Sequence, residues 1–141
     1  TGASDESRVR AAYEAAGVRA KVCAFIADMG GAYAAADLVI CRAGASTCFE
    51  LCLVKRPALL IPLPTASRNH QHLNAAALVR CGGADEGIQR ELTARSLMRY
   101  VLNKKENPLQ LSRMRQALGS LSVPDAARRV ADELERVARG Q

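Results

Sequence analysis

The residues best suited to chemistry lie in the run Cys41 to Glu50, where an apolar stretch meets a tight turn of small residues and then the start of a helix. Gly44 and Ala45 leave backbone N–H groups open to an anion, and the positive end of the following helix dipole favours one. The hydroxyls of Ser46 and Thr47 are further donors. The run lacks the Gly-Lys-Ser/Thr element of a Walker loop and the Gly-x-Gly-x-x-Gly fingerprint. It therefore predicts a phosphate or diphosphate site of another kind.

Two charged side chains belong to this run, Arg42 near its start and Glu50 at its end. Glu50 can accept hydrogen bonds from the two adjacent hydroxyls of a ribose, and Arg42 can reach a phosphate. Two plainer interpretations remain open. Thr47 and Glu50 have the Thr-x-x-Glu spacing of a helix capping box, and a single arginine at a strand end is as often a surface charge.

A second polar segment follows the apolar run Ala58 to Leu63. On a helix, Gln71 and Asn74 are three apart and share a face, so both amides can meet hydroxyl or acetamido groups of a sugar. Asn74 can equally brace a neighbouring loop. His70 and His72 are two apart and do not converge, which argues against zinc and favours surface histidines.

A third segment, Phe25 to Met29, offers backbone amides beside apolar side chains where a β-prone run ends. A flat base can lodge on such a surface, which makes Phe25, Ile26 and Met29 candidates for base binding. The alternative is a strand that simply ends at an Asp28 helix cap.

Metal and covalent chemistry find little support. Cys48 and Cys52 have the spacing of half a metal site, but no second Cys/His pair matches it, so we expect core thiols and neither metal nor cofactor. Five irregularly spaced cysteines indicate free thiols in a reducing compartment. No Ser/His/Asp arrangement or nucleophile elbow stands out, so no catalytic residue is assigned.

Alternating helices and strands must position these segments. Helical spacing and capping residues predict helices over 5–16, 28–36, 46–54, 70–80 and 93–103, from Pro108, and over 124–139. Apolar runs predict strands at 22–26, 37–41 and 58–63, and a short strand is also expected at 84–88. This order specifies a three-layer α/β fold with a Rossmann-like parallel sheet. Ligands then bind beyond the carboxyl ends of the strands, in the loops after Phe25, Cys41 and Leu63.

Length and charge narrow the possible partners. At 141 residues the chain has the size of one domain. Its net charge of +6 is concentrated in residues 90–141, which hold eleven Lys/Arg against six Asp/Glu. This tail is either a solvated helical face or a patch that favours an anionic membrane surface. Only five aromatic residues are present, and none is interleaved with basic ones, so nucleic-acid binding is not expected.

Together these motifs resemble the MurG family of bacterial UDP-N-acetylglucosamine transferases over almost the entire chain. The matching segments are Phe25-Ile26-Ala27-Asp28-Met29, Ala36-Asp37-Leu38-Val39-Ile40, Arg42-Ala43-Gly44-Ala45 with Thr47 and Glu50-Leu51, Ile61-Pro62-Leu63-Pro64, and His70-Gln71 with Asn74-Ala75. The resemblance implies a GT-B glycosyltransferase, in which two Rossmann-like domains face a cleft. Residues 1–141 would be the donor-binding C-terminal domain without its first strands, and the N-terminal acceptor domain would be absent.

The resemblance also implies roles for individual residues. The position of Ile26 would meet uracil, Ala45 to Thr47 the diphosphate, Glu50 the ribose and Gln71 the GlcNAc. The predicted donor site comprises Phe25, Ile26, Met29, Arg42, Gly44, Ala45, Ser46, Thr47, Glu50, His70, Gln71 and Asn74.

The implied reaction is an inverting, metal-independent transfer of GlcNAc from UDP-GlcNAc to lipid I, a lipid-linked muramyl-pentapeptide, which gives lipid II for peptidoglycan. The base and the acceptor pocket would lie in the absent domain. The enzyme would be peripheral on the cytoplasmic face of the bacterial inner membrane. By itself the chain is expected to bind UDP-GlcNAc without transferring the sugar.

The chain departs from the family pattern in two places. Lys55 stands where the family tends to have glycine, and the loop Thr65 to Asn69 differs from some members. Two other functions remain open. One is a separate donor-binding subunit of a two-chain GlcNAc transferase, and the other is a non-catalytic nucleotide-binding module in which Glu50 only caps its helix.

Overall fold

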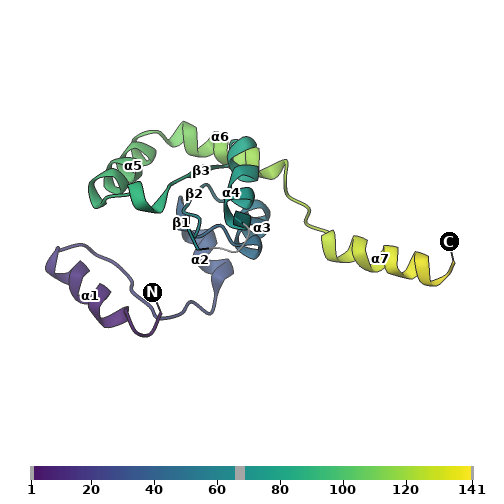
Figure 1. Ribbon diagram of the computed structural model, residues 1–141, viewed down its shortest axis with the longest axis horizontal. Coiled ribbons are helices and arrows are strands. Elements are labelled where there is room, and N and C mark those ends of the chain that lie inside the picture. Colours follow the sequence, from purple (N-terminus) through teal and green to yellow (C-terminus); the bar gives the residue numbers. More distant parts are fainter. Residues whose placement is uncertain (1, 66–68, 141) are drawn as a thin grey trace. The chain divides into compact units, whose positions relative to one another are not determined.

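The computed structural model describes residues 2–65 and 69–140. The chain forms two compact units, Thr1–Ala35 and Ala36–Gln141 (Figure 1). The loop Thr65 to Asn69, where the sequence departs from the family pattern, contains residues 66–68 and so lies partly outside the described residues.

The first unit contains two helices, α1 (Glu6–Ala15) and α2 (Met29–Ala35), both predicted from the sequence. Asp28 begins α2, because its Oδ1 accepts a hydrogen bond from the Gly31 N–H at 2.8 Å. This bond satisfies one of the unpaired donors of the first helical turn. The predicted Asp28 cap is confirmed.

The predicted strand over residues 22–26 is wrong. A strand is stable only when its backbone pairs with a neighbour, and residues 2–35 contain no strand in the described part of the chain. The segment instead follows an irregular path, in which Ala24 O accepts from the Gly2 N–H at 3.1 Å and Val22 O accepts from Arg10 Nη2 at 3.0 Å.

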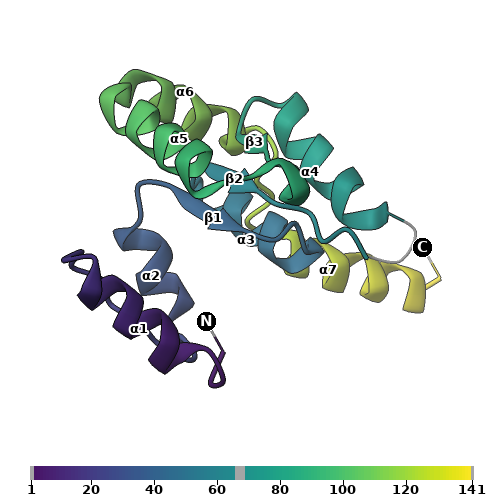
Figure 2. The same cartoon turned by 60° about the vertical axis from the view of Figure 1, so that its left-hand side comes forward.

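The second unit is built on a parallel sheet in the order β1 (Val39–Cys41), β2 (Ala58–Leu60) and β3 (Ala84–Glu86). α3 (Ala45–Val54) joins β1 to β2, and α4 (His70–Arg80) joins β2 to β3. Both crossovers run in the same direction, and because such connections are right-handed, the two helices lie on one face. They are in contact with each other (Figure 2). The predicted parallel α/β sheet is confirmed.

The strands are shorter than the sequence predicts. β2 ends at Leu60 because Pro62 and Pro64 have no N–H to donate to a neighbouring strand. One further ladder bond remains, from the Ile61 N–H to Cys41 O at 2.8 Å. The apolar runs thus continue as loops beyond the sheet, at the edge where ligands are expected.

A short 3-10 turn, η2 (Gln89–Glu91), leads from β3 to α5 (Ala94–Glu106). Thr93 caps α5, since its Oγ1 accepts from the Ser96 N–H at 3.1 Å, and Ser96 Oγ accepts from the Thr93 N–H at 2.9 Å. This reciprocal pair confirms the predicted Thr93 cap and fixes where the helix begins.

A buried ion pair fastens α5 to the sheet. Lys104 is 3% exposed, and its Nζ lies 2.7 Å from Asp85 Oδ2 on β3 and 3.7 Å from Met114 Sδ. Tyr100 Oη also donates to Asp85 Oδ2, at 2.8 Å. Burial, and secondly this hydrogen bond, raise the pKa of Tyr100 above its usual value, so the phenol stays protonated. The network holds α5 against the sheet as the third layer.

α6 (Pro108–Gly119) runs along the amino-terminal ends of the strands and packs against α3 and α5. Its Arg115 Nη2 lies 2.9 Å from Asp37 Oδ1, just before β1. A Cβ on Gly83, just before β3, would lie 2.5 Å from Leu118 Cδ2, so only glycine fits there. Because α6 occupies the amino-terminal edge, the carboxyl edge is left for ligands.

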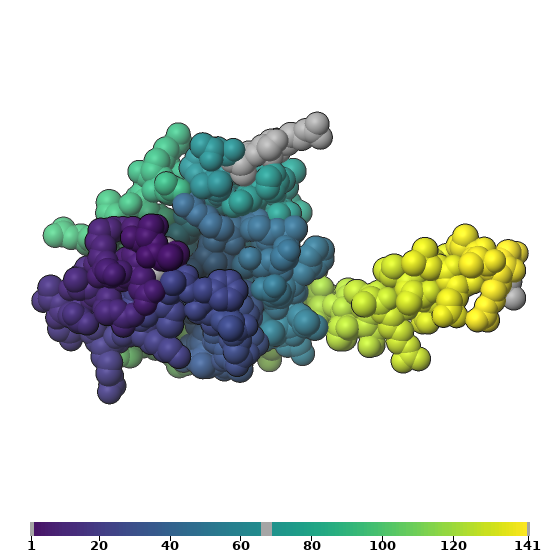
Figure 3. All heavy atoms as spheres, turned by 90° about the horizontal axis from the view of Figure 1, so that it is seen from below, coloured from purple at the N-terminus to yellow at the C-terminus, as the bar shows by residue number. Residues whose placement is uncertain are grey.

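The last helix, α7 (Ala126–Ala138), falls within the predicted range 124–139. None of its described residues is buried. Val130, Leu134 and Val137 share one face at helical spacing, and all three are exposed. Figure 3 shows this helix in yellow. In the described residues, no helix combines the length and apolarity that a bilayer crossing requires.

The core of the second unit is formed by residues of the sheet, α3 and α6. Leu51 of α3, Leu60 of β2 and Leu118 of α6 are fully buried, as are Pro57 and Pro62 beside β2. Burying a leucine side chain contributes about 2 kcal/mol. The core therefore lies between the sheet and its helices and leaves the carboxyl edge of the sheet for other interactions.

Lys55 ends α3 in the left-handed conformation, with φ 53° and ψ 48°. The Lys55 and Arg56 N–H groups bond back to Cys52 O and Leu51 O at 3.3 and 3.1 Å, in a C-terminal motif that usually ends with glycine. A Cβ costs roughly 1 kcal/mol in this conformation. We therefore expect Lys55→Gly to raise the free energy of unfolding by about 1 kcal/mol in urea denaturation.

The matched control for this prediction is Arg99→Gly, at an exposed position in the middle of α5. It should lower the free energy of unfolding by about 1 kcal/mol, because glycine is a poor helix former. A decrease for both variants would contradict the explanation from backbone strain.

Candidate functional site

The candidate site lies where the three strands end. Residues 42–44 follow β1, residues 61–65 follow β2, and residues 87 and 88 follow β3. Because the strands are parallel and in register, these loops leave the sheet at one edge. The predicted residues Arg42 to Glu50 and His70 to Asn74 lie in these loops and in the first turns of α3 and α4.

Within residues 2–65 and 69–140, no side chain caps the N-terminus of α3, which we call open in this sense. Gly44 precedes the helix with φ −64° and ψ 150° and has no side chain to cap it. The first bond of the helix runs from the Cys48 N–H to Gly44 O at 3.0 Å. The N–H groups of Ala45, Ser46 and Thr47 therefore precede the helical ladder and point out of the helix end. This geometry suits a phosphate or diphosphate.

The capping box suggested for Thr47 and Glu50 is wrong. A capping box needs its Thr immediately before the helix, whereas Thr47 is the third residue of α3. Glu50 is exposed and lies one turn beyond Ser46 and Thr47, on the same face. One turn is about 5.4 Å, and helical side chains lean toward the N-terminus. The carboxylate can therefore reach a sugar attached to a diphosphate at the helix end.

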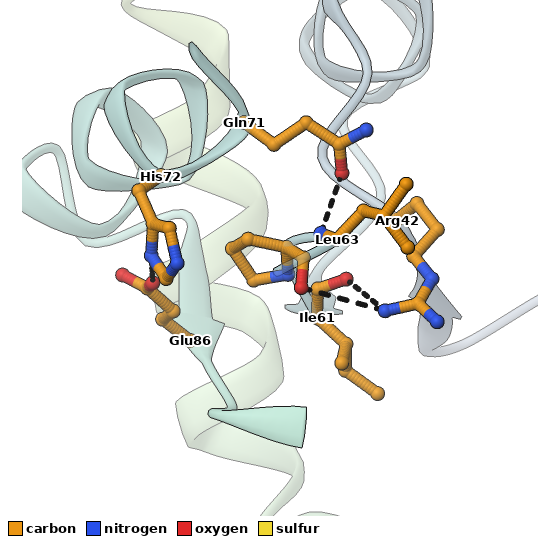
Figure 4. Close-up of polar contacts among 7 residues, drawn as sticks. Arg42, Ile61, Leu63, Gln71, His72 and Glu86 are labelled. Atoms are coloured by element: carbon orange, nitrogen blue, oxygen red, sulfur yellow. Dashed lines mark hydrogen bonds and ion pairs between the residues drawn. The ribbon is translucent and has the colours of Figure 1, made fainter. Parts of the chain in front are cut away.

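Arg42 joins the three loops. Its Nη1 donates to Ile61 O at 3.1 Å and to Pro62 O at 3.4 Å (Figure 4). It also donates to Gln89 Oε1 at 2.7 Å. Arg42 is therefore more than a solitary surface charge, although its guanidinium is exposed. Its Nη1 donates to uncharged carbonyl and amide oxygens of the same chain.

The first turns of α4 brace both loops. Gln71 Oε1 accepts from the Leu63 N–H at 2.9 Å (Figure 4), and Asn74 Nδ2 donates to Ala43 O at 3.0 Å. The bracing role considered for Asn74 is thus confirmed. Because Leu63 contributes a donor, the oxygen of the Gln71 amide must face it. The Nε2 group of Gln71 then points away from Leu63 as a donor for a ligand.

The two histidines lie in different surroundings, as their spacing predicts. His70 is exposed at the start of α4, and His72 Nδ1 lies 2.5 Å from Glu86 Oε1 at the end of β3 (Figure 4). Within residues 2–65 and 69–140, no group of three or more His, Cys, Asp or Glu residues is placed to hold a metal ion.

The three predicted base-binding residues lie in the first unit. Phe25, Ile26 and Met29 line an apolar hollow of about 1060 Å³ together with Tyr13 and Val22. Phe25 is 83% exposed and Ile26 46% exposed. The unit thus offers a base-sized apolar surface with backbone amides beside it.

Reasoning from sequence misses two polar residues of this edge, Gln89 and Glu86. Both belong to the end of β3 or to the loop that follows it. The rule that directs attention to the carboxyl ends of parallel strands applies to the predicted strand at 84–88 as well. The polar residues at the end of this predicted strand could therefore have been chosen as site candidates from the sequence.

Two cysteines lie close to the start of the site, Cys41 at the end of β1 and Cys48 in the first turn of α3. All five are free thiols. Burial, and secondly the neighbouring thiol of Cys48, raise the pKa of Cys41 to about 11. Burial and the thiol of Cys52 do the same for Cys48, also to about 11. Raised pKa values make thiols poor nucleophiles, so these residues pack rather than react.

At about pH 8 a thiol with a pKa near 11 is ionised in roughly one molecule in a thousand. We expect Cys41 and Cys48 to react with iodoacetamide at least about a hundredfold more slowly in the folded chain than in urea, measured by mass spectrometry. Because the folded pKa is raised, the rate should keep rising up to about pH 11. A native rate that levels off near pH 9 would contradict this.

Comparison with known proteins identifies the family. Residues 1–130 match the family described as the glycosyltransferase family 28 C-terminal domain. The chain belongs to this family. This family 28 domain is similar to UDP-N-acetylglucosamine--N-acetylmuramyl-(pentapeptide) pyrophosphoryl-undecaprenol N-acetylglucosamine transferases. The protein from Anaeromyxobacter sp. (strain Fw109-5) is 43% identical over 139 residues, which are 99% of this chain and 36% of the relative.

A protein of the same name from Myxococcus xanthus (strain DK1622) is 45% identical over 132 residues, 94% of this chain and 34% of the relative. The crystal structure of Acinetobacter baumannii MurG matches the family 28 domain with a TM-score of 0.85 and 31% identity, covering 96% of this chain and 41% of that one. The resemblance to the MurG family and the GT-B C-terminal fold are thus confirmed. The domain spans about a third of the length of its curated relatives.

Proposed function

We propose that this family 28 domain binds UDP-GlcNAc as the donor half of an inverting glycosyltransferase, which moves GlcNAc onto lipid I to form lipid II. The observation that carries the proposal is the open N-terminus of α3, with Glu50 one turn further along the same face. The names of its relatives state an N-acetylglucosamine transferase with a muramyl-pentapeptide pyrophosphoryl-undecaprenol acceptor.

Each part of the donor has a partner of matching chemistry. The N–H groups of Ala45 to Thr47 bind the diphosphate, and Glu50 accepts from the ribose hydroxyls. The base rests on the surface of Phe25, Ile26 and Met29. On the sugar side lie the Nε2 group of Gln71 and the neighbouring polar side chains of His70 and Asn74.

The helix end also suits the chemistry of the step. As the bond from GlcNAc to the diphosphate breaks, negative charge grows on the departing UDP. Fixed N–H dipoles and the positive end of α3 stabilise that charge without a metal ion. On this proposal, the domain binds the donor and stabilises the leaving group. Another part of the protein binds the acceptor and supplies the base.

On this proposal, residues 1–141 form the donor domain of a longer protein that carries an N-terminal acceptor domain. From the lipid-linked acceptor in the relatives' names, we infer that the enzyme works at the cytoplasmic face of the inner membrane of a bacterium. The basic excess of residues 90–141 suits an anionic lipid surface.

The proposal is tested by titrating the isotope-labelled chain with UDP-GlcNAc, UDP-glucose and ADP-glucose and following its amide NMR signals. We expect saturable shifts at residues 44–50 and 70–74 with UDP-GlcNAc, weaker affinity for UDP-glucose, and no saturation with the adenine nucleotide. The lack of a saturable, uridine-dependent change even at millimolar ligand would contradict donor binding.

A further inference from the structure

The candidate site contains one side chain that touches all three strand-end loops, and its contacts differ from those of a phosphate ligand. Arg42 Nη1 meets Ile61 O at 3.1 Å, Pro62 O at 3.4 Å and Gln89 Oε1 at 2.7 Å. We infer that Arg42 is a positioning residue for the donor sugar: it fastens the loop after β2 so that Gln71 is held in place. This inference rests on the proposed function and adds a residue role to it.

The connection from Arg42 to Gln71 runs through three consecutive residues. Arg42 holds the carbonyls of Ile61 and Pro62, and the next residue, Leu63, donates its N–H to Gln71 Oε1 at 2.9 Å (Figure 4). Pro62 is fully buried, and its ring fixes the backbone between these contacts. A shift of the two carbonyls therefore moves the Leu63 N–H and the amide that it holds.

The geometry of the guanidinium explains why an arginine serves here. Nη1 carries two hydrogens in a fixed plane and can serve acceptors on two sides, a carbonyl of one loop and the Gln89 amide oxygen of another. The bond to Gln89 joins residues 47 apart in the sequence and is the shortest of the three. Gln89 thus sets the direction in which Arg42 presents its donors.

The alternative role is the one first predicted, in which Arg42 binds the diphosphate directly. The two roles predict different effects on the affinities for UDP and UDP-GlcNAc. A diphosphate contact would contribute equally to UDP and UDP-GlcNAc, whereas a contact that orders Gln71 contributes only when GlcNAc is present. Affinities for uridine, UDP and UDP-GlcNAc therefore separate the two roles.

The test measures these three affinities by NMR titration of the 141-residue chain in the wild type, in Arg42→Met, in Arg42→Lys and in Gln89→Ala. For Arg42→Met we expect UDP affinity to change less than about twofold. The preference for UDP-GlcNAc over UDP should fall by up to about tenfold, the upper end for one neutral hydrogen bond, here that of the Gln71 amide to the sugar. Gln89→Ala should act in the same direction but less strongly. Arg42→Lys should restore the preference only in part, because an ammonium does not reproduce the planar fork.

Arg113→Met, an exposed arginine on α6, is the matched control and should leave all three affinities unchanged. A loss of UDP affinity relative to uridine that Arg42→Lys fully restores would overturn the inference in favour of a direct phosphate contact. Equal losses for all three ligands would reduce Arg42 to a general structural role.

A second measurement tests the inference without any ligand, and so independently of the proposed function. Hydrogen exchange of the Leu63 amide, measured without ligand, should accelerate at least about tenfold in Arg42→Met, because the loop that carries it is released. If the wild-type chain bound no uridine ligand, the proposed function would fail, and this exchange rate would still decide whether Arg42 fastens the loop. Unchanged protection of Leu63 would overturn the fastening itself.

Discussion

Glu50→Ala is expected to weaken the binding of UDP and UDP-GlcNAc by on the order of a hundredfold. The exposed carboxylate lies one helical turn from the N–H groups of Ala45 to Thr47. There it can accept from both ribose hydroxyls, and two hydrogen bonds to a charged group contribute about 3 kcal/mol together. Titration by NMR or calorimetry measures the loss. Glu50→Gln should lose less, because its amide oxygen still accepts one bond without the charge.

The stability of the variant separates ribose binding from a structural role for Glu50. Since Thr47 lies inside α3, Glu50 is not part of a capping box, and its replacement should change the free energy of unfolding by no more than about 0.5 kcal/mol. Glu106→Ala at the end of α5 is a matched exposed control and should leave affinity unchanged. A Glu50 variant that loses stability while keeping its affinity for UDP would support the non-catalytic module.

Features that depend on local chemistry were predictable from the sequence. The Asp28 and Thr93 caps and the Pro108 helix start follow from the hydrogen-bonding groups of single residues, and all three are formed. The open turn at Gly44 was predictable for the same reason, because small residues between an apolar run and a helix leave N–H groups exposed. The position of the candidate anion site could therefore be inferred without the fold.

Features that depend on a distant partner were not predictable. The apolar run at 22–26 has the composition of a strand, but strand formation requires a neighbouring backbone, which the described residues of its unit do not supply. The Thr-x-x-Glu spacing of Thr47 and Glu50 does not show that the helix begins two residues earlier, at Ala45. Likewise, the contact between Arg42 and Gln89 exists only because β1 and β3 end at one edge.

Breaking the buried ion pair of Lys104 with Asp85 is expected to destabilise the chain strongly. Lys104 is 3% exposed, whereas the Asp85 side chain is 43% exposed. Asp85→Asn removes the negative charge and leaves Lys104 buried without a counter-charge. Breaking a buried pair in this way costs about 3 kcal/mol, here at the low end because water reaches the aspartate. Urea denaturation measures the change in the free energy of unfolding.

Because Lys104 is much more deeply buried than Asp85, replacing Lys104 alone should lower the free energy of unfolding less than replacing Asp85 alone. Lys104→Met removes the costly buried charge and fills its place with an apolar side chain beside Met114, while Asp85 remains hydrated and keeps the hydrogen bond from Tyr100. It should therefore cost less than about 1 kcal/mol. In the double variant, Lys104→Met should recover most of the stability lost in Asp85→Asn, because no charge is left unpaired. Losses that simply add would show that each residue acts independently of the other, and that the ion pair does not hold α5 to the sheet.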